Sequence, residues 1–426
     1  MHNMRYLKLL TGLAVALSLF GCAEEGILGT GTAATGGTGG TGGTNGITYS
    51  GALALKSHFQ EKIALVDGSG EEQFRVVGLS VSDTTPPTII VKGNADTPGA
   101  YDDPVAVALF NANVFIYRAD SIGQTALNKS LSPDDIAIST DGTKLVHTHD
   151  AGKLEIIDPA TKTVQQIGSS LTFTTTWPGS QITDDGSLVA FISDADLTGN
   201  NPSNRRQIFT LTTDGNDIIK QVTNLTNLAN IGASHFALSG DGSIIFFDNG
   251  SDLMADGSNA DGNDEIFSIN TDGSNLKQVT NTTADGTIDE IKSDVNGSTV
   301  VFHRYDLNLD PSNALYTVDT GTSTSTFVSN FESTTTGILE TWEQFDISSD
   351  GSTIFYMTGE KDTSMDHIYS ANGDGSNITL LLSNDTNRIK APHSSADGSS
   401  VTFYSKGDFG KTTIEESQYQ VYTLTP

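Results

Sequence analysis

Short apolar stretches separated by turns that contain Gly and Asp run through the chain from about residue 47 to its end. The clearest unit spans Phe236 to Asn281, where the runs 236–239 and 243–247 flank Gly240-Asp241-Gly242 and the runs 266–270 and 276–280 flank residues 271–274. Gly supplies the positive φ that a tight turn requires, so each pair of runs is predicted to form a β-hairpin. The unit is therefore expected to be a sheet of four antiparallel strands.

The first turn of this unit recurs six times along the chain, at Asp141-Gly142, Asp185-Gly186, Asp241-Gly242, Asn296-Gly297, Asp350-Gly351 and Asp397-Gly398. One four-stranded sheet cannot bury both faces until neighbouring copies stack on it, so the repeat predicts an all-β fold, a single β-propeller of four-stranded antiparallel blades. Third strands are expected near Ile63, Val114, Leu154, Ile208, Ile266, Leu315, Ile368 and Val421. This count predicts eight blades, with seven as the alternative because 79–111 fits the pattern poorly. Gly46 to Ser50 is expected to close the ring against the last blade.

The second turn recurs within a longer pattern, as IFTLTTDGNDIIKQVTN from Ile208, IFSINTDGSNLKQVTN from Ile266 and IYSANGDGSNITLLLSN from Ile368. Together with the strand-DG-strand first hairpin, these lines resemble the TolB-like (WD40-like) β-propeller repeat over residues 47–426. The resemblance implies a propeller fold. The chain departs from the pattern in lacking Pro before most of the first-turn Asp residues.

The N-terminal segment, residues 1–21, is predicted to be a signal peptide, because Arg5 and Lys8 precede an apolar run too short to span a bilayer as a helix. It ends Leu-Phe-Gly before Cys22, which resembles a bacterial lipobox. That resemblance implies lipidation of Cys22, the only cysteine, and Ala23 after it implies outer-membrane sorting. The alternative is an ordinary signal peptide with an incidental Cys. Residues 22–46, rich in Gly and Thr, are predicted to be a flexible tether for the propeller at 47–426.

The net charge of the chain limits the classes of partner that it is expected to bind. The chain has a net charge of −30 and a pI of about 4.3. Such a surface repels phosphate backbones, so nucleic-acid binding is not expected, and it disfavours contact with anionic lipid except through the acyl anchor. The protein is expected to be a monomer in the bacterial cell envelope, anchored in the outer membrane by its lipid and either periplasmic or surface-exposed.

No catalytic motif is evident: the sequence has no Gly-x-Ser-x-Gly elbow, no P-loop and no Cys/His zinc spacing. These observations predict a propeller that binds an envelope protein, peptide or ligand as a scaffold, without catalysis. The alternative is a polysaccharide lyase or hydrolase that uses Asp135 and Glu290 at the mouth of the channel as acid and base.

The loops between second and third strands are rich in oxygen ligands, most of all NGSDLMADGSNADGNDE from Asn249. Asp256, Ser258, Asp261 and Asp264 offer hard oxygen atoms at close spacing, which suits Ca²⁺. No other cofactor is expected. The alternative interpretation is a set of Asp- and Asn-containing turns without an ion.

Residues at the start of the first strands should line the mouth of the channel. Polar or aromatic side chains stand six or eight positions before the first-turn residue in several blades, and they predict a site for a ligand or partner at Asp135, Trp177, His235, Glu290, Trp342 and Gln344. The two tryptophans occupy equivalent positions in two blades. They are interpreted either as core filling or as aromatic groups that grip a polar ligand.

Overall fold

The fold is all β. A computed structural model describes residues 27–31, 48–49, 51–55, 74–81, 89–95, 105–110, 113–118, 136–149, 153–158, 163–167, 180–216, 218–225, 235–283, 286–305, 313–330, 344–359, 366–384, 389–405 and 420–426. In this part of the chain every regular element is a β-strand. None of the described segments is a helix with the length and apolar character to cross a membrane.

Six sheets are built from strands that follow one another directly in the sequence and pair antiparallel. They are β8–β11 (Ile136–Ile138, Leu145–His149, Lys153–Asp158, Thr163–Ile167), β12–β15 (Ser180–Ile182, Leu188–Ser193, Gln207–Thr212, Ile219–Gln221), β16–β19 (Phe236–Leu238, Ile244–Asn249, Glu265–Asn270, Lys277–Gln278), β20–β23 (Thr287–Ser293, Thr299–Tyr305, Asn313–Asp319, Thr324–Asn330), β24–β27 (Phe345–Ile347, Thr353–Gly359, Asp366–Asn372, Thr379–Asn384) and β28–β30 (Ile389–Ser394, Val401–Ser405, Gln420–Thr425). Each of these sheets contains one of the six repeated Asp-Gly or Asn-Gly turns between its first two strands.

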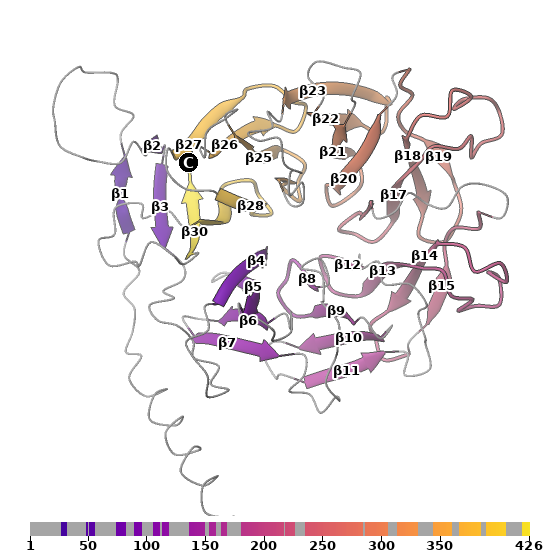
Figure 1. Ribbon diagram of the computed structural model, residues 1–426, viewed down its shortest axis with the longest axis horizontal. Coiled ribbons are helices and arrows are strands. Elements are labelled where there is room, and N and C mark those ends of the chain that lie inside the picture. The colour runs from indigo at the N-terminus through magenta and orange to yellow at the C-terminus, as the bar shows by residue number, and fades with distance from the viewer. Residues whose placement is uncertain are drawn as a thin grey trace, which may run out of the picture.

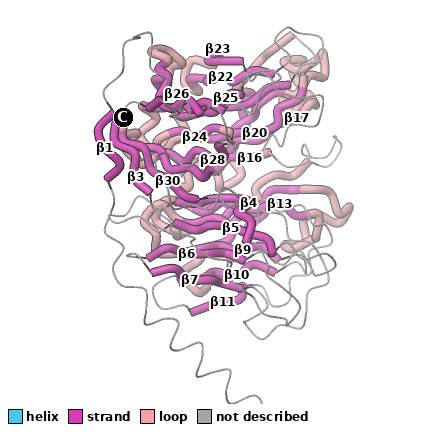
Figure 2. Tube along the Cα trace, turned by 60° about the vertical axis from the view of Figure 1, so that its left-hand side comes forward, coloured by secondary structure: helices cyan, strands magenta, loops and turns pink. Residues whose placement is uncertain are grey.

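The N-terminal strands complete the ring. They are β1 (Ile27–Gly31), β2 (Thr48–Tyr49), β3 (Gly51–Leu55) and the sheet β4–β7 (Phe74–Val81, Ile89–Ala95, Val105–Phe110, Asn113–Arg118). The first strands of all the sheets contact one another in the order β4, β8, β12, β16, β20, β24, β28, and β28 contacts β4 again. The sheets therefore surround a common centre as the blades of a single β-propeller (Figures 1 and 2).

The prediction of eight blades is wrong. Six of the expected third strands are third strands, namely those at Leu154, Ile208, Ile266, Leu315, Ile368 and Val421. Val114 instead lies in β7, the fourth strand of the β4–β7 sheet, and Ile63 is outside the described residues. The segment between residues 74 and 118 thus supplies one sheet, next to the six that carry the repeated turn.

Ring closure also differs from the prediction. The strand that pairs with β30 of the last blade is β3, with Leu53 opposite Leu424. Within the segment expected to make this contact, Thr48–Tyr49 forms β2 and pairs with β27 of the preceding blade. Ile27–Gly31, which lies in the range of the predicted tether, forms β1 on the other side of β3. An N-terminal strand therefore covers the edge that the C-terminal blade would otherwise expose.

The repeated first turns form because Asp, Gly and Ser or Thr occupy fixed positions in them. In the β16–β17 turn, the Asp241 carboxylate accepts hydrogen bonds from the Ser243 backbone N–H at 2.9 Å and from the Ser239 hydroxyl at 2.8 Å. Gly242 follows with φ = 73°, a conformation that a side chain would strain. All six turn glycines have a positive φ, so the Asp-Gly and Asn-Gly pairs predicted the hairpins correctly.

The core lies between neighbouring blades. Second and third strands are buried along nearly their whole length, as in β17 and β18, whereas the outer strand β23 is largely exposed. One apolar cluster joins Ile208 and Val222 of the β12–β15 blade to Phe236, Phe247 and Phe267 of the next. Strands sandwiched on both faces are expected to be continuously apolar, which explains runs such as IIFF at 244–247.

Backbone hydrogen bonds also link the repeated turns of successive blades. They run from Asp141 N to Asp184 O, Asp184 N to Gly240 O, Asp241 N to Val295 O, Val295 N to Ser349 O, and Asp350 N to Ala396 O, with lengths between 2.8 and 3.2 Å. One rim of the channel is therefore a continuous chain of hydrogen-bonded turns across all six repeated blades. This rim fixes the blades relative to one another and so positions the first strands that line the channel.

Candidate functional site

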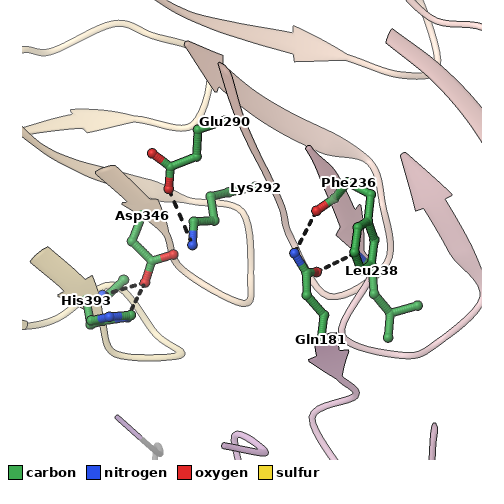
Figure 3. Close-up of polar contacts among 8 residues, drawn as sticks. Gln181, Phe236, Leu238, Glu290, Lys292, Asp346 and His393 are labelled. Carbon is green, nitrogen blue, oxygen red and sulfur yellow. Dashed lines mark hydrogen bonds and ion pairs between the residues drawn. The ribbon is translucent and has the colours of Figure 1, made fainter. Parts of the chain in front are cut away.

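A polar cluster lies on the channel wall where the first strands of three blades meet. It consists of Glu290 and Lys292 on β20, Asp346 on β24 and His393 on β28 (Figure 3). Lys292, Asp346 and His393 hold the same place in the repeat, four residues before their turn residues Asn296, Asp350 and Asp397. In β24 the flanking Phe345 and Ile347 are buried while Asp346 between them is half-buried, as the alternation of side chains in a strand requires.

Gln181 shows what this position does in a blade outside the cluster. Its side-chain N–H donates to the Phe236 carbonyl at 2.6 Å, and its Oε1 accepts from the Leu238 N–H at 2.7 Å (Figure 3). Both partners belong to β16, whose channel-side edge has no further strand to pair with. The Gln181 side chain therefore supplies hydrogen-bond partners to backbone groups at the open edge of β16 in the next blade, which is a structural role.

Asp346 makes the equivalent contact with the next blade and also contacts the imidazole of His393. Its Oδ2 accepts from the Ser394 N–H at 2.9 Å and lies 3.5 Å from His393 Nδ1. Burial would raise the pKa of Asp346, but the hydrogen bond and charge of His393, the charge of Lys292 and the Ser394 N–H together bring this pKa below its usual value. Asp346 is therefore a carboxylate at neutral pH.

The cation of the cluster is Lys292. Its Nζ lies 3.6 Å from Glu290 Oε1, and its side chain is 28% exposed, against 11% for that of Glu290. Figure 3 shows the Lys292 side chain between Glu290 and Asp346. A partly exposed ammonium group paired with Glu290 can still bind an anionic group from the channel.

His393 supplies the imidazole of the cluster. Its Nδ1 faces Asp346, whereas its Nε2 is buried and has no hydrogen-bond partner among the described residues. A carboxylate on one ring nitrogen fixes the orientation of the imidazole and favours the proton on that nitrogen. Buried polar atoms without a partner are uncommon, and catalysis is one of their recognised explanations. His393 is therefore an imidazole that a carboxylate orients, and its second nitrogen has no partner among the described residues.

The sequence-predicted site residues lie in several places. Cys22, Asp135, Trp177 and Trp342 are outside the described residues. Glu290 is in the polar cluster, and the carbonyl of Gln344 accepts from the Met357 N–H at 2.9 Å at the start of β24. Lys292, Asp346 and His393 were missed, although a polar residue at the centre of an otherwise buried first strand is a signal visible in the sequence.

His235 forms a different pair, with His303 of β21. Burial, then the charge of His303, lowers the pKa of His235 to about 4, and an interaction with the Ile288 backbone opposes this. Burial likewise lowers the pKa of His303 to about 4. The hydrogen bond of 3.2 Å between its Nε2 and Asn313 Oδ1 acts in the opposite direction and raises this pKa. Both rings are therefore neutral at pH 7, so neither supplies a cation to the channel.

The predicted calcium ligands do not form a compact set of carboxylates. Asp256 and Asp261 are exposed, and the Asp256 carboxylate accepts from the Ser258 N–H at 2.9 Å within its own turn. The Ser258 hydroxyl donates to Gln278 at 2.6 Å, and Asp264 is half-buried. Within the described ranges no group of three or more His, Cys, Asp or Glu side chains is placed to hold a metal ion.

Comparison with known proteins supports the fold. No protein-family model and no curated protein sequence matches the chain. Among solved structures, an oligogalacturonate lyase from Vibrio parahaemolyticus is similar, with a TM-score of 0.53 and 11% identity over 90% of this chain and 97% of that one. An oligogalacturonate lyase in complex with manganese has a TM-score of 0.54 and 12% identity, over 89% of this chain and 94% of that one. A third similar structure is the β-propeller domain of the Trilobed protease from Pyrococcus furiosus, which is described as having an open velcro topology. Its TM-score is 0.50 and its identity 12%, over 82% of this chain and 95% of that one.

These similarities correct the prediction that the chain is not an enzyme. Propellers that extend over nearly the same length include oligogalacturonate lyases, which are catalytic. The prediction rested on missing sequence motifs, and a propeller enzyme assembles its site from separate blades, so it needs no local motif.

Proposed function

We propose that this protein is a polysaccharide lyase that cleaves a uronate-containing chain at the wall of the propeller channel. The observation that carries the proposal is the polar cluster itself, in which His393 is oriented by Asp346 next to the ammonium group of Lys292. The similarity to oligogalacturonate lyases supports it by showing that such a fold accommodates this reaction. The alternative, a hydrolase acting through carboxylates at the channel mouth, retains Glu290 but leaves His393 without a role.

The cluster supplies what a β-elimination requires. The reaction removes the proton from the carbon next to the sugar carboxylate, forms a carbon–carbon double bond and breaks the bond to the neighbouring glycosidic oxygen. His393 Nε2 takes the proton, and the imidazolium that forms is stabilised by Asp346. Lys292 binds the sugar carboxylate and stabilises the charge that develops on it. The leaving oxygen receives its proton back from the imidazolium, so protons balance.

A metal enters no step of this mechanism. One of the similar structures holds manganese, but the described residues of this chain contain no group of three carboxylate, imidazole or thiolate side chains fit to bind such an ion. The positive charge beside the substrate carboxylate is assigned to Lys292 because this residue is the ammonium group of the polar cluster.

The experiment is a cleavage assay on a panel of uronate and neutral polysaccharides, followed by ultraviolet absorbance and by reducing-end release. A lyase produces both signals together, because each cut creates one unsaturated uronate and one new end. New ends without absorbance would identify the hydrolase. Neither signal on any uronate polymer would refute an enzyme of this class.

We also propose that the protein is a TolB-like lipoprotein of the bacterial outer membrane, anchored through acylated Cys22 and tethered by residues 22–46. The support is the lipobox-like sequence and the Gly- and Thr-rich stretch after it. An anchored propeller would keep its site near the envelope, where polymeric substrates arrive.

A further inference from the structure

Two loops that join second to third strands are structural copies of each other. They are residues 193–207 in the β12–β15 blade and residues 249–265 in the β16–β19 blade. In the first loop, Asn201 is buried and its Nδ2 donates to the Arg205 carbonyl at 2.7 Å. In the second, buried Asn259 donates in the same way to the Asn263 carbonyl at 3.0 Å. The two loops therefore use one architecture, and differences between them are informative.

The first loop is closed by its own hydrogen bonds. Asn201 Oδ1 accepts from the Arg205 N–H at 3.1 Å, and Asp196 Oδ1 accepts from the Asn201 N–H at 2.8 Å. Every one of these oxygen atoms has a donor inside the loop.

The second loop leaves the amide oxygen that matches Asn201 Oδ1 without a donor. Asn259 is only 3% exposed, and its Oδ1 is buried with no hydrogen-bond partner. Asp252, the counterpart of Asp196, also accepts from the N–H five residues further on, since its Oδ2 lies 2.8 Å from Gly257 N, but its second oxygen, Oδ1, is buried with no hydrogen-bond partner. The orientation of the Asn259 amide is fixed, because its Nδ2 faces the carbonyls of Ser251 and Asn263 and a flip would bring three oxygen atoms together. The contact with the Ser251 carbonyl places the Asn259 amide beside the residue that directly precedes Asp252.

The two loops also differ in their charged residues. Between 193 and 207, Asp194 and Asp196 are matched by Arg205 and Arg206. Between 249 and 265 there are five acidic residues and no Lys or Arg, and the positions of the two arginines hold Asn263 and Asp264. The second loop thus lacks the positive charge that its copy carries.

We propose that the 249–265 loop binds a divalent cation, with Ca²⁺ preferred, through Asp252 Oδ1 and Asn259 Oδ1. A buried carboxylate oxygen and a buried amide oxygen without donors are hard ligands that a cation satisfies at once, and burying them unpaired is costly. The same loop brings further oxygen atoms close to Gly250, because a Cβ there would come within 2.9 Å of Asp264 Oδ1 and 3.2 Å of the Gly262 carbonyl. Asp264 also feels the charge of Arg304, so it is not assigned as a ligand.

This site differs from the calcium set expected from the sequence alone. Asp256 and Asp261, which that set contained, are exposed on the outside of the loop. Asp252 and Asn259 look unremarkable in the sequence, and only the comparison with the closed loop identifies them.

The test is thermal unfolding of the full chain and calorimetric titration, both with CaCl₂ against a chelator at matched ionic strength. Wild type should melt several degrees higher with millimolar Ca²⁺, since a ligand that binds only the folded state stabilises it. Asp252→Asn should lose this shift and bind Ca²⁺ at least tenfold more weakly. Asp256→Asn removes the same charge from the exposed side of the same loop, and Asp196→Asn alters the closed loop, so both should keep the wild-type response.

Comparing calcium responses keeps the test independent of any change in basal stability. A wild type indifferent to Ca²⁺ would overturn the proposal. So would an Asp252→Asn response equal to that of Asp256→Asn, because the effect would then come from general screening of an acidic protein. Neither outcome bears on the proposed lyase activity.

Discussion

Protonation of His303 should destabilise the propeller as the pH falls below neutrality. His303 is 3% exposed on β21, and burial lowers its pKa from 6.5 to about 4. A base whose pKa is lower in the folded state binds a proton more readily when the chain is unfolded. The stability that the neutral ring contributes is therefore complete above pH 6.5 and is lost progressively as the pH falls towards 4.

The magnitude follows from the two pKa values. Between pH 7 and pH 5 this one group should lower the free energy of unfolding by about 2 kcal/mol. The measurement is urea unfolding of wild type and of His303→Gln at both pH values. Glutamine keeps a donor for Asn313 but does not titrate, so the variant should lose about 2 kcal/mol less than wild type over this interval.

Comparing the variant with wild type removes the contribution of the many surface carboxylates, which titrate in both proteins. His303→Phe provides a second non-titrating variant of similar ring shape, and it should show the same reduced pH dependence from a lower starting stability, because Asn313 loses its partner. Equal pH dependence in wild type and His303→Gln would refute the reasoning, since it would mean that the ring is not held neutral by burial.

Three further predictions concern the channel wall, the net charge and the anchor. Gln181→Ala should lower the free energy of unfolding by about 1–3 kcal/mol, because Phe236 O and Leu238 N lose their partners. An unchanged urea midpoint would contradict this structural role of Gln181. Cleavage of a uronate polymer should become faster as NaCl is raised from low concentration, because a net charge of −30 repels the substrate until salt screens it; a steady fall would contradict this. Cys22→Ser should move the protein from the membrane fraction to the soluble fraction, and unchanged fractionation would exclude the lipid anchor.

The sequence predicts the repeated blades well because their turns are encoded locally. Each Asp-Gly or Asn-Gly pair needs only its own neighbours to form, such as Ser239 and Ser243 around Asp241. Ring closure is not encoded this way, since the pairing of β3 with β30 joins residues more than 360 positions apart in sequence. The number of blades was misjudged where the turn signal is missing, between residues 74 and 118.

The polar cluster was only partly predictable. Glu290 was found by its offset from the turn, but His393 and Asp346 meet because two blades are adjacent in the ring. The role of a polar residue at that position depends on its partner in the next blade: Gln181 meets backbone and is structural, whereas Asp346 meets an imidazole. Sequence alone cannot separate these two cases.

Turnover of a uronate oligosaccharide by wild type and by His393→Gln is the most direct test of the proposed function. Both proteins should show the same melting temperature, since the variant keeps a donor towards Asp346. Wild type should release unsaturated product, and His393→Gln should do so at least a hundredfold more slowly, the usual loss when a general base is removed. Full activity in a folded His393→Gln variant would contradict the assignment of the channel-wall cluster as the catalytic site.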